Sequence, residues 1–274
     1  MPKQKSKISI QEYYEKFAES ERLSTGFGQL EFERTKFILK RFLLNPPAKV
    51  LDIGGATGVY SLWLARQGYE VHLIDQSVKL VQQARQSAQN QPDAPISSFT
   101  VGDARSLNFP EKFADAVLLF GPLYHLIEPK ERHRALKETY RTLKSNGILF
   151  AAAISRFASV INGFLQEFFH DPIFMDIVKQ DLTDGQHRNL TDNIMYFTDA
   201  YFHRPAELKK EVEGAGFKKA MVFPVEGIGA LVSHFEEMWN DEARRGYLLE
   251  IIEQTEKEVS ILGISPHLLC VAYK

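Results

Sequence analysis

The residues best suited to chemistry lie in one stretch, VLDIGGATGVYSLWLARQGYEVHLID, which runs from Val50 to Asp75. An apolar run reaches Asp52, a turn follows with glycines at positions 54, 55 and 58, and a second apolar run ends at Asp75. A strand, a glycine turn, a helix and a strand in this order are typical of a unit that holds a nucleoside-bearing ligand. The glycine spacing then indicates which kind of ligand.

The glycines do not fit a dinucleotide site. Such a site requires G-x-G-x-x-G, because the second glycine lets the backbone approach a pyrophosphate and the third lets helix and strand pack closely. Starting from Gly54, the required positions hold Ala56 and Val59, and the frame that starts one residue later fails as well. The turn also lacks the lysine of a phosphate-binding P-loop. An acid at Asp52 would repel a pyrophosphate, but it suits a ligand that carries an ammonium group.

The elements that must position these residues alternate regularly up to about residue 154. Strand patterns occur at 48–54, 69–75, 96–104, 113–121 and 148–154, and helical patterns occur at 59–69, 77–90 and 130–147. This alternation predicts parallel strands joined by right-handed crossovers, and therefore an open, doubly wound α/β sheet. Such sheets bind ligands beyond the carboxyl ends of their strands. Because residues 52–58, Asp75, Asp103 and 120–125 end successive strands, we expect them to form one site.

On these motifs the chain resembles the class I S-adenosylmethionine-dependent methyltransferases over about residues 36–154. DIGGATG matches the family's acid-x-Gly-x-Gly-x-Gly loop, with Ala56 in place of the middle glycine, and LID, GDA and LLFGPLYHL follow in the family's order. The resemblance implies S-adenosylmethionine as the cofactor and S-adenosylhomocysteine as its product. It also implies a Rossmann-like seven-stranded methyltransferase sheet with helices on both faces and a helical lid inserted after strand 5.

The resemblance implies a role for each residue at the strand ends. The implied cofactor-binding residues are Asp52, Gly54, Gly55 and Gly58 in the loop, Asp75 at both ribose hydroxyls, Gln76 beside the adenine, Asp103 and Ala104 at the polar edge of the adenine, and Phe120 or Gly121 at the methionine ammonium. Each acid taken alone could equally be a helix cap or a turn residue. Their joint position at successive strand ends of one sheet favours the cofactor site.

Segments outside the alternating core are expected to form the acceptor side. We expect four parts: an N-terminal helical flap at 1–45, an S-adenosylmethionine-binding Rossmann-like core at 46–154, a helical lid at 155–198, and the rest of the core at 199–274 with a helical insertion at about 227–265. The insertion is either a second part of the lid or an interaction surface. The last strand, HLLCVAYK, is expected to run antiparallel to the others.

Methyl transfer requires an in-line approach and a pocket that excludes water, and it needs a general base only if the acceptor must lose a proton early. The candidate catalytic residues are Tyr124 and His125, which follow the fourth strand. The candidates on the substrate side are Tyr13 and Tyr14 in the flap, His170 in the lid and His203 before a helix, with His187 and Glu226 as weaker candidates. Each also has a structural alternative, such as helix packing for the two tyrosines.

Composition limits the remaining choices. The 274 residues carry a formal net charge of −2, so no basic footprint for nucleic acid appears, and the single cysteine allows no disulfide framework. No Cys/His cluster has the spacing of a metal site, and no apolar run is long enough to cross a membrane. We therefore expect a cytoplasmic protein that acts on a small-molecule acceptor, with neither metal, nucleic acid nor membrane as a partner, and with its oligomeric state open.

Three alternatives stay open. A nucleic-acid or protein methyltransferase is disfavoured by the turn GPLY, because amino-methylating DNA enzymes usually have Asn or Asp, then Pro, Pro and an aromatic residue there. An NAD(P)-linked oxidoreductase is disfavoured by the failed glycine frames. A non-catalytic S-adenosylmethionine-binding regulatory protein would have the same motifs, so only turnover distinguishes it.

Overall fold

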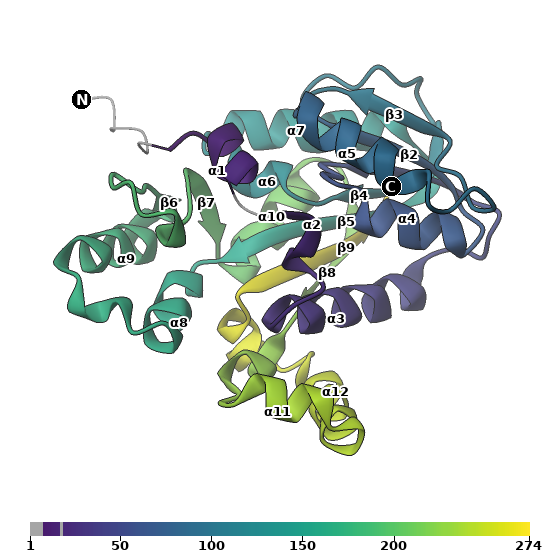
Figure 1. The fold of residues 1–274 in the computed structure, drawn as a ribbon. Coiled ribbons are helices and arrows are strands. Elements are labelled where there is room, and N and C mark those ends of the chain that lie inside the picture. Colours follow the sequence, from purple (N-terminus) through teal and green to yellow (C-terminus); the bar gives the residue numbers. More distant parts are fainter. Residues whose placement is uncertain (1–7, 17–18) are drawn as a thin grey trace. The chain divides into compact units, whose positions relative to one another are not determined.

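The expected alternation of strands and helices is present in the computed structural model of the chain, which describes residues 8–16 and 19–274 (Figure 1). The strands are β1 (Lys49–Ile53), β2 (Glu70–Asp75), β3 (Ser98–Val101), β4 (Ala114–Leu119), β5 (Leu143–Ser155), β6 (Gln186–His187), β7 (Ala200–His203), β8 (Lys218–Pro224) and β9 (His267–Tyr273). The α-helices are α1 (Ile10–Lys16), α2 (Glu19–Arg22), α3 (Phe27–Phe42), α4 (Val59–Arg66), α5 (Val78–Ala88), α6 (Pro122–His125), α7 (Pro129–Thr142), α8 (Ala158–Leu165), α9 (Pro172–Asp184), α10 (Pro205–Gly214), α11 (Phe235–Asn240) and α12 (Glu242–Thr255). Short 3-10 helices are η1 (Phe168–His170), η2 (Ile194–Tyr196), η3 (Gly227–Leu231) and η4 (Val259–Ile264).

The strands form one mostly parallel sheet in the order β3-β2-β1-β4-β5-β7-β6, and β9 pairs with both β5 and β8. β1 runs parallel to β2 and β4, and β5 runs parallel to β4. The amide of Lys274 donates to Gly147 and that of Ser155 donates to Pro266, so β9 runs antiparallel to β5, as expected. The α/β class and the seven expected strands are confirmed, and β6 and β7 are two short strands that the sequence pattern did not indicate.

The chain divides into two compact units. The first unit contains Met1–Phe37, Ala153–Leu208 and Val222–Leu269, and the second contains Ile38–Ala152, Lys209–Met221 and Cys270–Lys274. The division does not follow the four parts expected from the sequence, which remain a prediction. Residues 1–7 and 17–18 of the expected flap lie outside the described residues.

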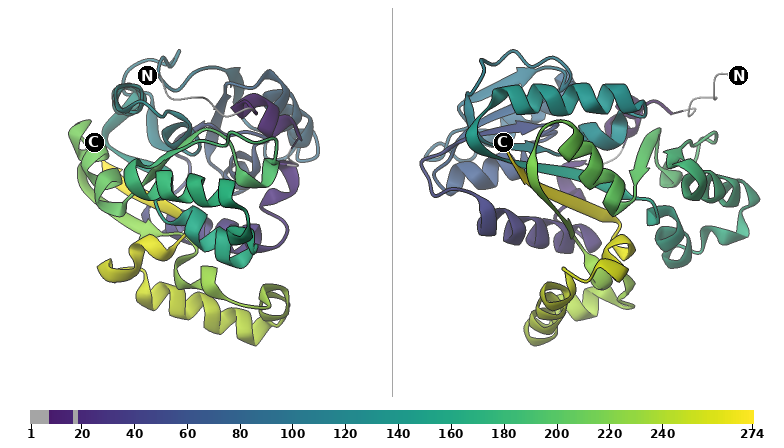
Figure 2. Two further views of the ribbon diagram at one scale, coloured as in Figure 1. Left: turned by 90° about the vertical axis from the view of Figure 1, so that its left-hand side faces the viewer. Right: turned by 180° about the vertical axis from the view of Figure 1, so that it is seen from behind.

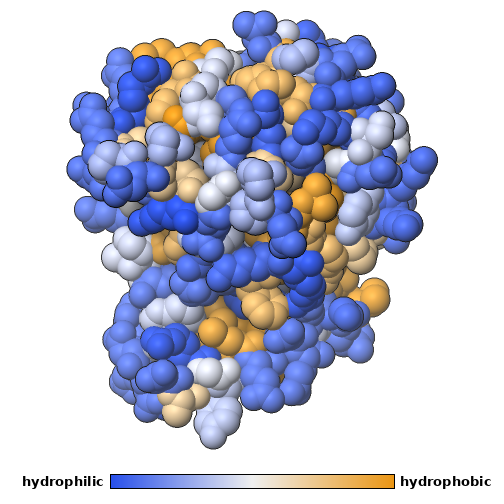
Figure 3. Space-filling model, turned by 90° about the vertical axis from the view of Figure 1, so that its right-hand side faces the viewer, coloured by the Kyte–Doolittle hydropathy of each residue, from blue (hydrophilic) through white to orange (hydrophobic). Residues whose placement is uncertain are grey.

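The second unit holds the strands that position the strand-end residues. β1 and β4 are almost completely buried, and α4 and α5 cover one face of the sheet while α7 covers the other (Figures 1 and 2). The start of α5 is fixed by Ser77, whose hydroxyl oxygen accepts from the Leu80 amide, and Pro129 opens α7. Figure 3 shows a face on which hydrophilic residues predominate and apolar residues form separate patches. No helix in the described part of the chain combines the length and the apolar character that crossing a bilayer requires.

One expectation about this unit is wrong. The helix predicted to end at Gly147 ends at Thr142, and the following residues are already part of β5. Leu143 pairs with Ala114 of β4, and the Lys144 ammonium lies 2.8 Å from an Asp115 carboxylate oxygen. Tertiary pairing with β4 therefore outweighs the helical preference of these residues.

Apolar clusters hold together the described part of the first unit. One joins α3 to the 227–265 segment and consists of Leu30, Phe235, Trp239, Leu248 and Ile252. Another lies within the segment expected to be a lid and consists of Phe174, Ile177, Val178 and Tyr196. Both the 227–265 segment and the 155–198 segment are mainly helical, and Figure 2 shows α11 and α12 side by side. Whether either segment covers an acceptor stays a prediction.

Candidate functional site

The glycine loop between β1 and α4 passes close to the turn that follows β4. Gly54 has a φ of 82°, and a Cβ atom there would collide with the Phe120 carbonyl oxygen and lie 2.7 Å from the Pro122 ring. The Gly54 amide donates to the Ile74 carbonyl at 2.8 Å, which fixes the loop to the end of β2 as well. Because no side chain fits at Gly54, the backbone itself forms the surface at the ends of three strands.

Ala56 adopts a backbone conformation that glycine takes up readily. Its φ is 45°, in the left-handed region that L-residues other than glycine seldom occupy. Its amide donates to Asp75 Oδ2 at 3.0 Å, so the loop is held in this path by the acid that ends β2. The sequence departure at Ala56 therefore leaves the turn intact.

We expect the substitution Ala56→Gly to change the free energy of unfolding by less than about 1 kcal/mol, because relief of the left-handed conformation offsets the larger unfolded-state entropy of glycine. The matched control is Ala135→Gly in the middle of α7, which should cost at least about 1 kcal/mol. Urea unfolding of both variants measures the difference. Equal destabilisation by the two substitutions would show that Ala56 carries no strain.

Asp52 is buried beneath the loop at the end of β1. Its Oδ2 accepts a hydrogen bond from the Ser61 hydroxyl at 2.6 Å, whereas its buried Oδ1 has no hydrogen-bond partner in the part of the chain that the structure describes. Burial raises the pKa of Asp52 to about 6, although the Ser61 hydrogen bond opposes this. A buried carboxylate oxygen without a donor suits a ligand with an ammonium group, as the sequence predicted for this position.

Asp75 lies half-buried at the end of β2. Oδ2 accepts from the Ala56 amide and Oδ1 from the Ser77 amide at 2.8 Å, and each oxygen retains a lone pair. Burial raises the pKa of Asp75, and these backbone hydrogen bonds counteract the rise. Its neighbour Gln76 is exposed. The carboxylate is thus held rigidly at the place where the resemblance puts a ribose, and its role stays a prediction.

Asp103 already has a strong partner. Its carboxylate accepts from the Arg105 amide at 2.8 Å and pairs with the Arg105 guanidinium, which also binds Glu131 at 2.8 Å. Arg105 lowers the pKa of Asp103, so the carboxylate is ionised. An adenine amine would share Asp103 with this arginine. Ala104, next in the chain, is buried. The pairing of Arg105 with Asp103 was not predicted, because this neighbouring basic residue could equally have faced solvent.

The turn after β4 contains the two candidate catalytic residues. Gly121 has a φ of 114°, and α6 begins directly after it with Pro122. Tyr124 and His125 follow on α6, both half-buried, with their ring centroids 4.7 Å apart. The structure therefore places them beside the turn that contacts Gly54, as the motif order predicted. Their participation in catalysis stays a prediction.

The substrate-side candidates all belong to the first unit. Tyr13 is buried and makes edge contacts with Tyr14 and with Phe197, which supports the alternative of helix packing for the tyrosines. His170 is exposed at the end of η1, with its Nδ1 against the Glu167 carbonyl. His203 is completely buried at the end of β7.

His187 joins two parts of the segment expected to be a lid. Its Nδ1 lies 2.8 Å from Asp181 Oδ2 and its Nε2 lies 2.7 Å from the Tyr196 carbonyl oxygen. Both partners are acceptors, so both ring nitrogens donate and the ring is an imidazolium. Burial disfavours this charge, but the Asp181 carboxylate outweighs burial and raises the pKa of His187. With both nitrogens engaged, His187 is a structural residue.

We expect this imidazolium to make stability depend on pH. Since the folded-state pKa of His187 is raised, its stabilisation is complete below the unfolded value of about 6.5 and is lost as pH rises through the folded value. His187→Gln should therefore reduce the loss of unfolding free energy between neutral and alkaline pH. The exposed His234→Gln is the matched control and should keep the wild-type slope. Identical slopes in all three proteins would contradict a charged His187.

The sequence reasoning missed one charged group in the first unit. Glu226, a weak candidate, lies against His267 at the start of β9, and Glu31 of α3 lies on the same side of that ring. The contact between Glu226 and His267 could have been predicted from the pairing of the last two strands. Nothing in the pattern of an amphipathic helix could have indicated Glu31.

Comparisons with known proteins support the reading of the second unit. Residues 51–151 match the model of a methyltransferase domain family. Glycine/sarcosine N-methyltransferase of Parasynechococcus marenigrum is 35% identical over 144 residues, which cover 51% of this chain and 49% of the relative. The ubiquinone/menaquinone biosynthesis C-methyltransferase UbiE of Pectobacterium carotovorum is 27% identical over 188 residues, 65% of this chain and 70% of the relative. The chain thus spans about half the length of the first of these curated relatives.

Solved structures share the fold. A protein from Methanosarcina mazei, described as an S-adenosylmethionine-dependent methyltransferase, superimposes with a TM-score of 0.57 over 86% of this chain and 96% of its own, at 21% sequence identity. At that identity the likeness concerns the fold. The match to the methyltransferase domain model covers residues 51–151. These residues include the glycine loop and the strand ends described above.

Proposed function

Because the chain carries a class I S-adenosylmethionine-dependent methyltransferase domain, we propose that it transfers the methyl group of this cofactor to a small, partly apolar acceptor. The cofactor supplies an activated methyl group on a sulfonium. The observation that carries the proposal is the fixed arrangement of three strand ends, in which Asp75 holds the Ala56 amide and Gly54 packs against Phe120. At Gly54 this arrangement lets the backbone itself approach the ligand, because no side chain fits there.

The residues present fit the cofactor. The buried Asp52 Oδ1 has no partner among the described residues, and the carboxylate of Asp75 has lone pairs left for a diol. We infer that Asp75 binds the ribose, that Asp103 and Ala104 meet the adenine edge, and that the Phe120 or Gly121 carbonyl meets the methionine ammonium. These residues would bind and orient the cofactor. The chemistry of the sulfonium leaves little else for the protein to supply than alignment and exclusion of water.

The acceptor is proposed to be a small molecule. The relatives named above act, by their names, on glycine or sarcosine and in ubiquinone or menaquinone biosynthesis, so nitrogen and carbon acceptors are both compatible with this domain. The net charge of −2 gives no support to a polyanionic partner. Tyr124 and His125 on α6 are the proposed acceptor-side residues of the second unit, and removal of a proton by His125 would matter only for a hydroxyl acceptor.

Calorimetric titration with S-adenosylmethionine, S-adenosylhomocysteine and NAD tests the cofactor. We expect saturable binding of the first two and no heat with NAD, because the loop fails the dinucleotide spacing. Binding of NAD alone would overturn the proposal. Turnover is then tested by following S-adenosylhomocysteine release with a panel of amine, hydroxyl and carbon acceptors. Tight cofactor binding without turnover on any acceptor would favour a regulatory protein, and turnover on DNA or protein alone would exclude the small-molecule acceptor.

A further inference from the structure

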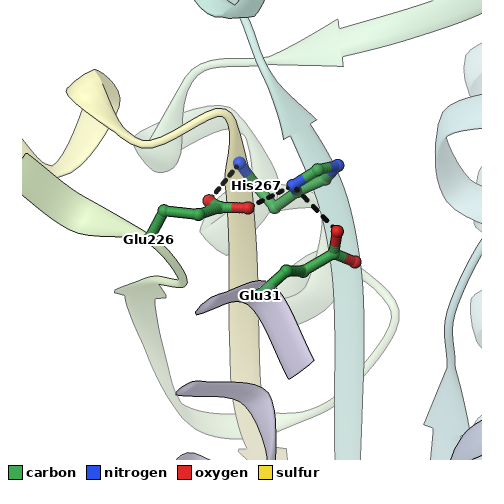
Figure 4. A group of neighbouring side chains, drawn as sticks. All are labelled: Glu31, Glu226 and His267. Carbon is green, nitrogen blue, oxygen red and sulfur yellow. Dashed lines mark hydrogen bonds and ion pairs between the residues drawn. The ribbon is translucent and has the colours of Figure 1, made fainter. Parts of the chain in front are cut away.

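Four ionisable side chains of the first unit lie close together, and one of them is a histidine. They are Arg22 at the end of α2, Glu31 on α3, Glu226 just after β8 and His267 at the start of β9. Figure 4 shows Glu31, Glu226 and His267. His267 Nδ1 lies 2.5 Å from Glu226 Oε1 and 3.8 Å from Glu31 Oε2. Arg22 forms a two-pronged ion pair with Glu31, and these four residues together carry no net charge when the histidine is protonated. We call them the His267 group.

The ring of His267 is held in one orientation. Glu226 Oε2 accepts from the Ser265 hydroxyl at 2.7 Å and from the His267 amide at 3.0 Å, so this carboxylate cannot turn away from the ring. A carboxylate only accepts hydrogen bonds, and therefore Nδ1 carries a proton. Figure 4 shows that both carboxylates lie on the Nδ1 side and that the other ring nitrogen points away from them.

The second nitrogen, Nε2, is available. Among the described residues it neither makes a hydrogen bond nor appears among the buried polar atoms without a partner, and the side chain is 31% exposed. Burial disfavours a charged ring, but Glu31 and Glu226 outweigh burial and raise the pKa of His267 to about 9. At neutral pH, Nε2 therefore carries a proton too, so it can donate a hydrogen bond but cannot act as a base.

The position of the ring suits a ligand. The Ser155 amide at the end of β5 donates to the Pro266 carbonyl, and the Val225 amide just after β8 donates to the His267 carbonyl. His267 thus lies at the edge where β5 ends. Ligands of open α/β sheets bind beyond the carboxyl ends of the parallel strands, and β5 is one of these.

We propose that His267 is a ligand-binding residue of the first unit whose Nε2–H donates a charge-assisted hydrogen bond to the carboxylate of a small molecule, with Glu226 and Glu31 as positioning residues. This carboxylate contact does not depend on the proposed function. Hydrogen bonds between two charged groups are stronger than those between neutral ones, so a single imidazolium can select a carboxylate over an amide.

A divalent cation is the competing occupant of this group. One ligand atom from each of Glu31, Glu226 and His267 lies within 4.8 Å of the others. However, a cation would have to displace the proton from Nδ1 and compete with Arg22 for Glu31. The hydrogen bonds present therefore favour the imidazolium, and metal binding is an outcome of the test below.

The experiment follows the imidazole Cε1–H and Nε2 resonances of His267 by NMR, with and without S-adenosylhomocysteine, assigned through His267→Gln. The probes are acetate and benzoate, with acetamide and benzamide as their neutral counterparts. We expect a saturable shift with the carboxylates only, and binding at least about tenfold weaker in His267→Gln. His234→Gln, which removes an exposed histidine, should bind as the wild type does.

A second variant distinguishes a change in the charge of His267 from a failure of the protein to fold. Glu226→Gln should lower the pKa of His267, so benzoate binding should weaken at about pH 8 and recover at about pH 6, where the ring is charged again. No shift with either carboxylate, or equal shifts with the amides, would overturn the proposal. Shifts produced by Mn²⁺ or Zn²⁺ and reversed by a chelator, without any response to benzoate, would replace it with a metal site. Failure to bind S-adenosylhomocysteine would instead count against the proposed function alone.

Discussion

Asp75→Ala is expected to weaken binding of S-adenosylhomocysteine by at least about 100-fold, because hydrogen bonds to a charged group contribute about 1.5–3 kcal/mol each and the proposed role gives Asp75 two hydroxyls. The substitution also removes the acceptor for the Ala56 amide at 3.0 Å and for the Ser77 amide at 2.8 Å, so the glycine loop loses its attachment to β2. Calorimetric titration of wild type and variant measures the change.

Two further variants make this result specific. Asp75→Asn keeps one oxygen and should lie between wild type and Asp75→Ala. Asp93→Ala removes an exposed carboxylate from the loop that precedes β3, at the opposite edge of the sheet, and should bind as the wild type does. If Asp75→Ala bound the ligand with wild-type affinity while remaining folded, the assignment of the ribose to this strand end would be wrong.

Arg34→Met is expected to lower the free energy of unfolding by about 3–5 kcal/mol, because it removes the guanidinium that pairs with a buried carboxylate. Arg34 Nη2 lies 2.6 Å from Glu256 Oε2, and both side chains are only 2% exposed. The Arg34 Nε also donates to the Val225 carbonyl, at 3.4 Å. Urea unfolding followed by circular dichroism gives the change in stability.

The double variant Arg34→Met/Glu256→Leu tests the cause. With the Glu256 carboxylate gone as well, the substituted pair no longer buries a charge, and most of the lost stability should return. Lys179→Met removes one partner of the exposed Lys179–Asp176 pair, whose side chains are 68% and 76% exposed, and should change stability by less than about 0.5 kcal/mol. A double variant as unstable as Arg34→Met would point to lost packing of the arginine rather than to the loss of its charge beside the Glu256 carboxylate.

The sequence alone determined those parts of the protein in which the hydrophobic pattern of an element also indicates where its end residues lie. Buried strand runs alternate with helical runs, and the acids Asp52 and Asp75 end two of the strands. Because parallel strands end at one edge of a sheet, the glycine loop and these acids had to meet there. The positive φ of Ala56 was not predicted, because the path of the turn depends on how its amide is held by Asp75.

Only the tertiary structure decided what depends on partners that are distant in the chain. Residues 143–147 join β5 rather than the preceding helix because β4 offers a pairing edge. Arg105 turns toward Asp103 because Glu131 lies within its reach. Glu31, Glu226 and His267 lie close together. The sequence pattern of a helix does not indicate which charged residues of a strand will lie beside it. Local periodicity fixes which face of an element is buried, but it does not fix which charges share that interior.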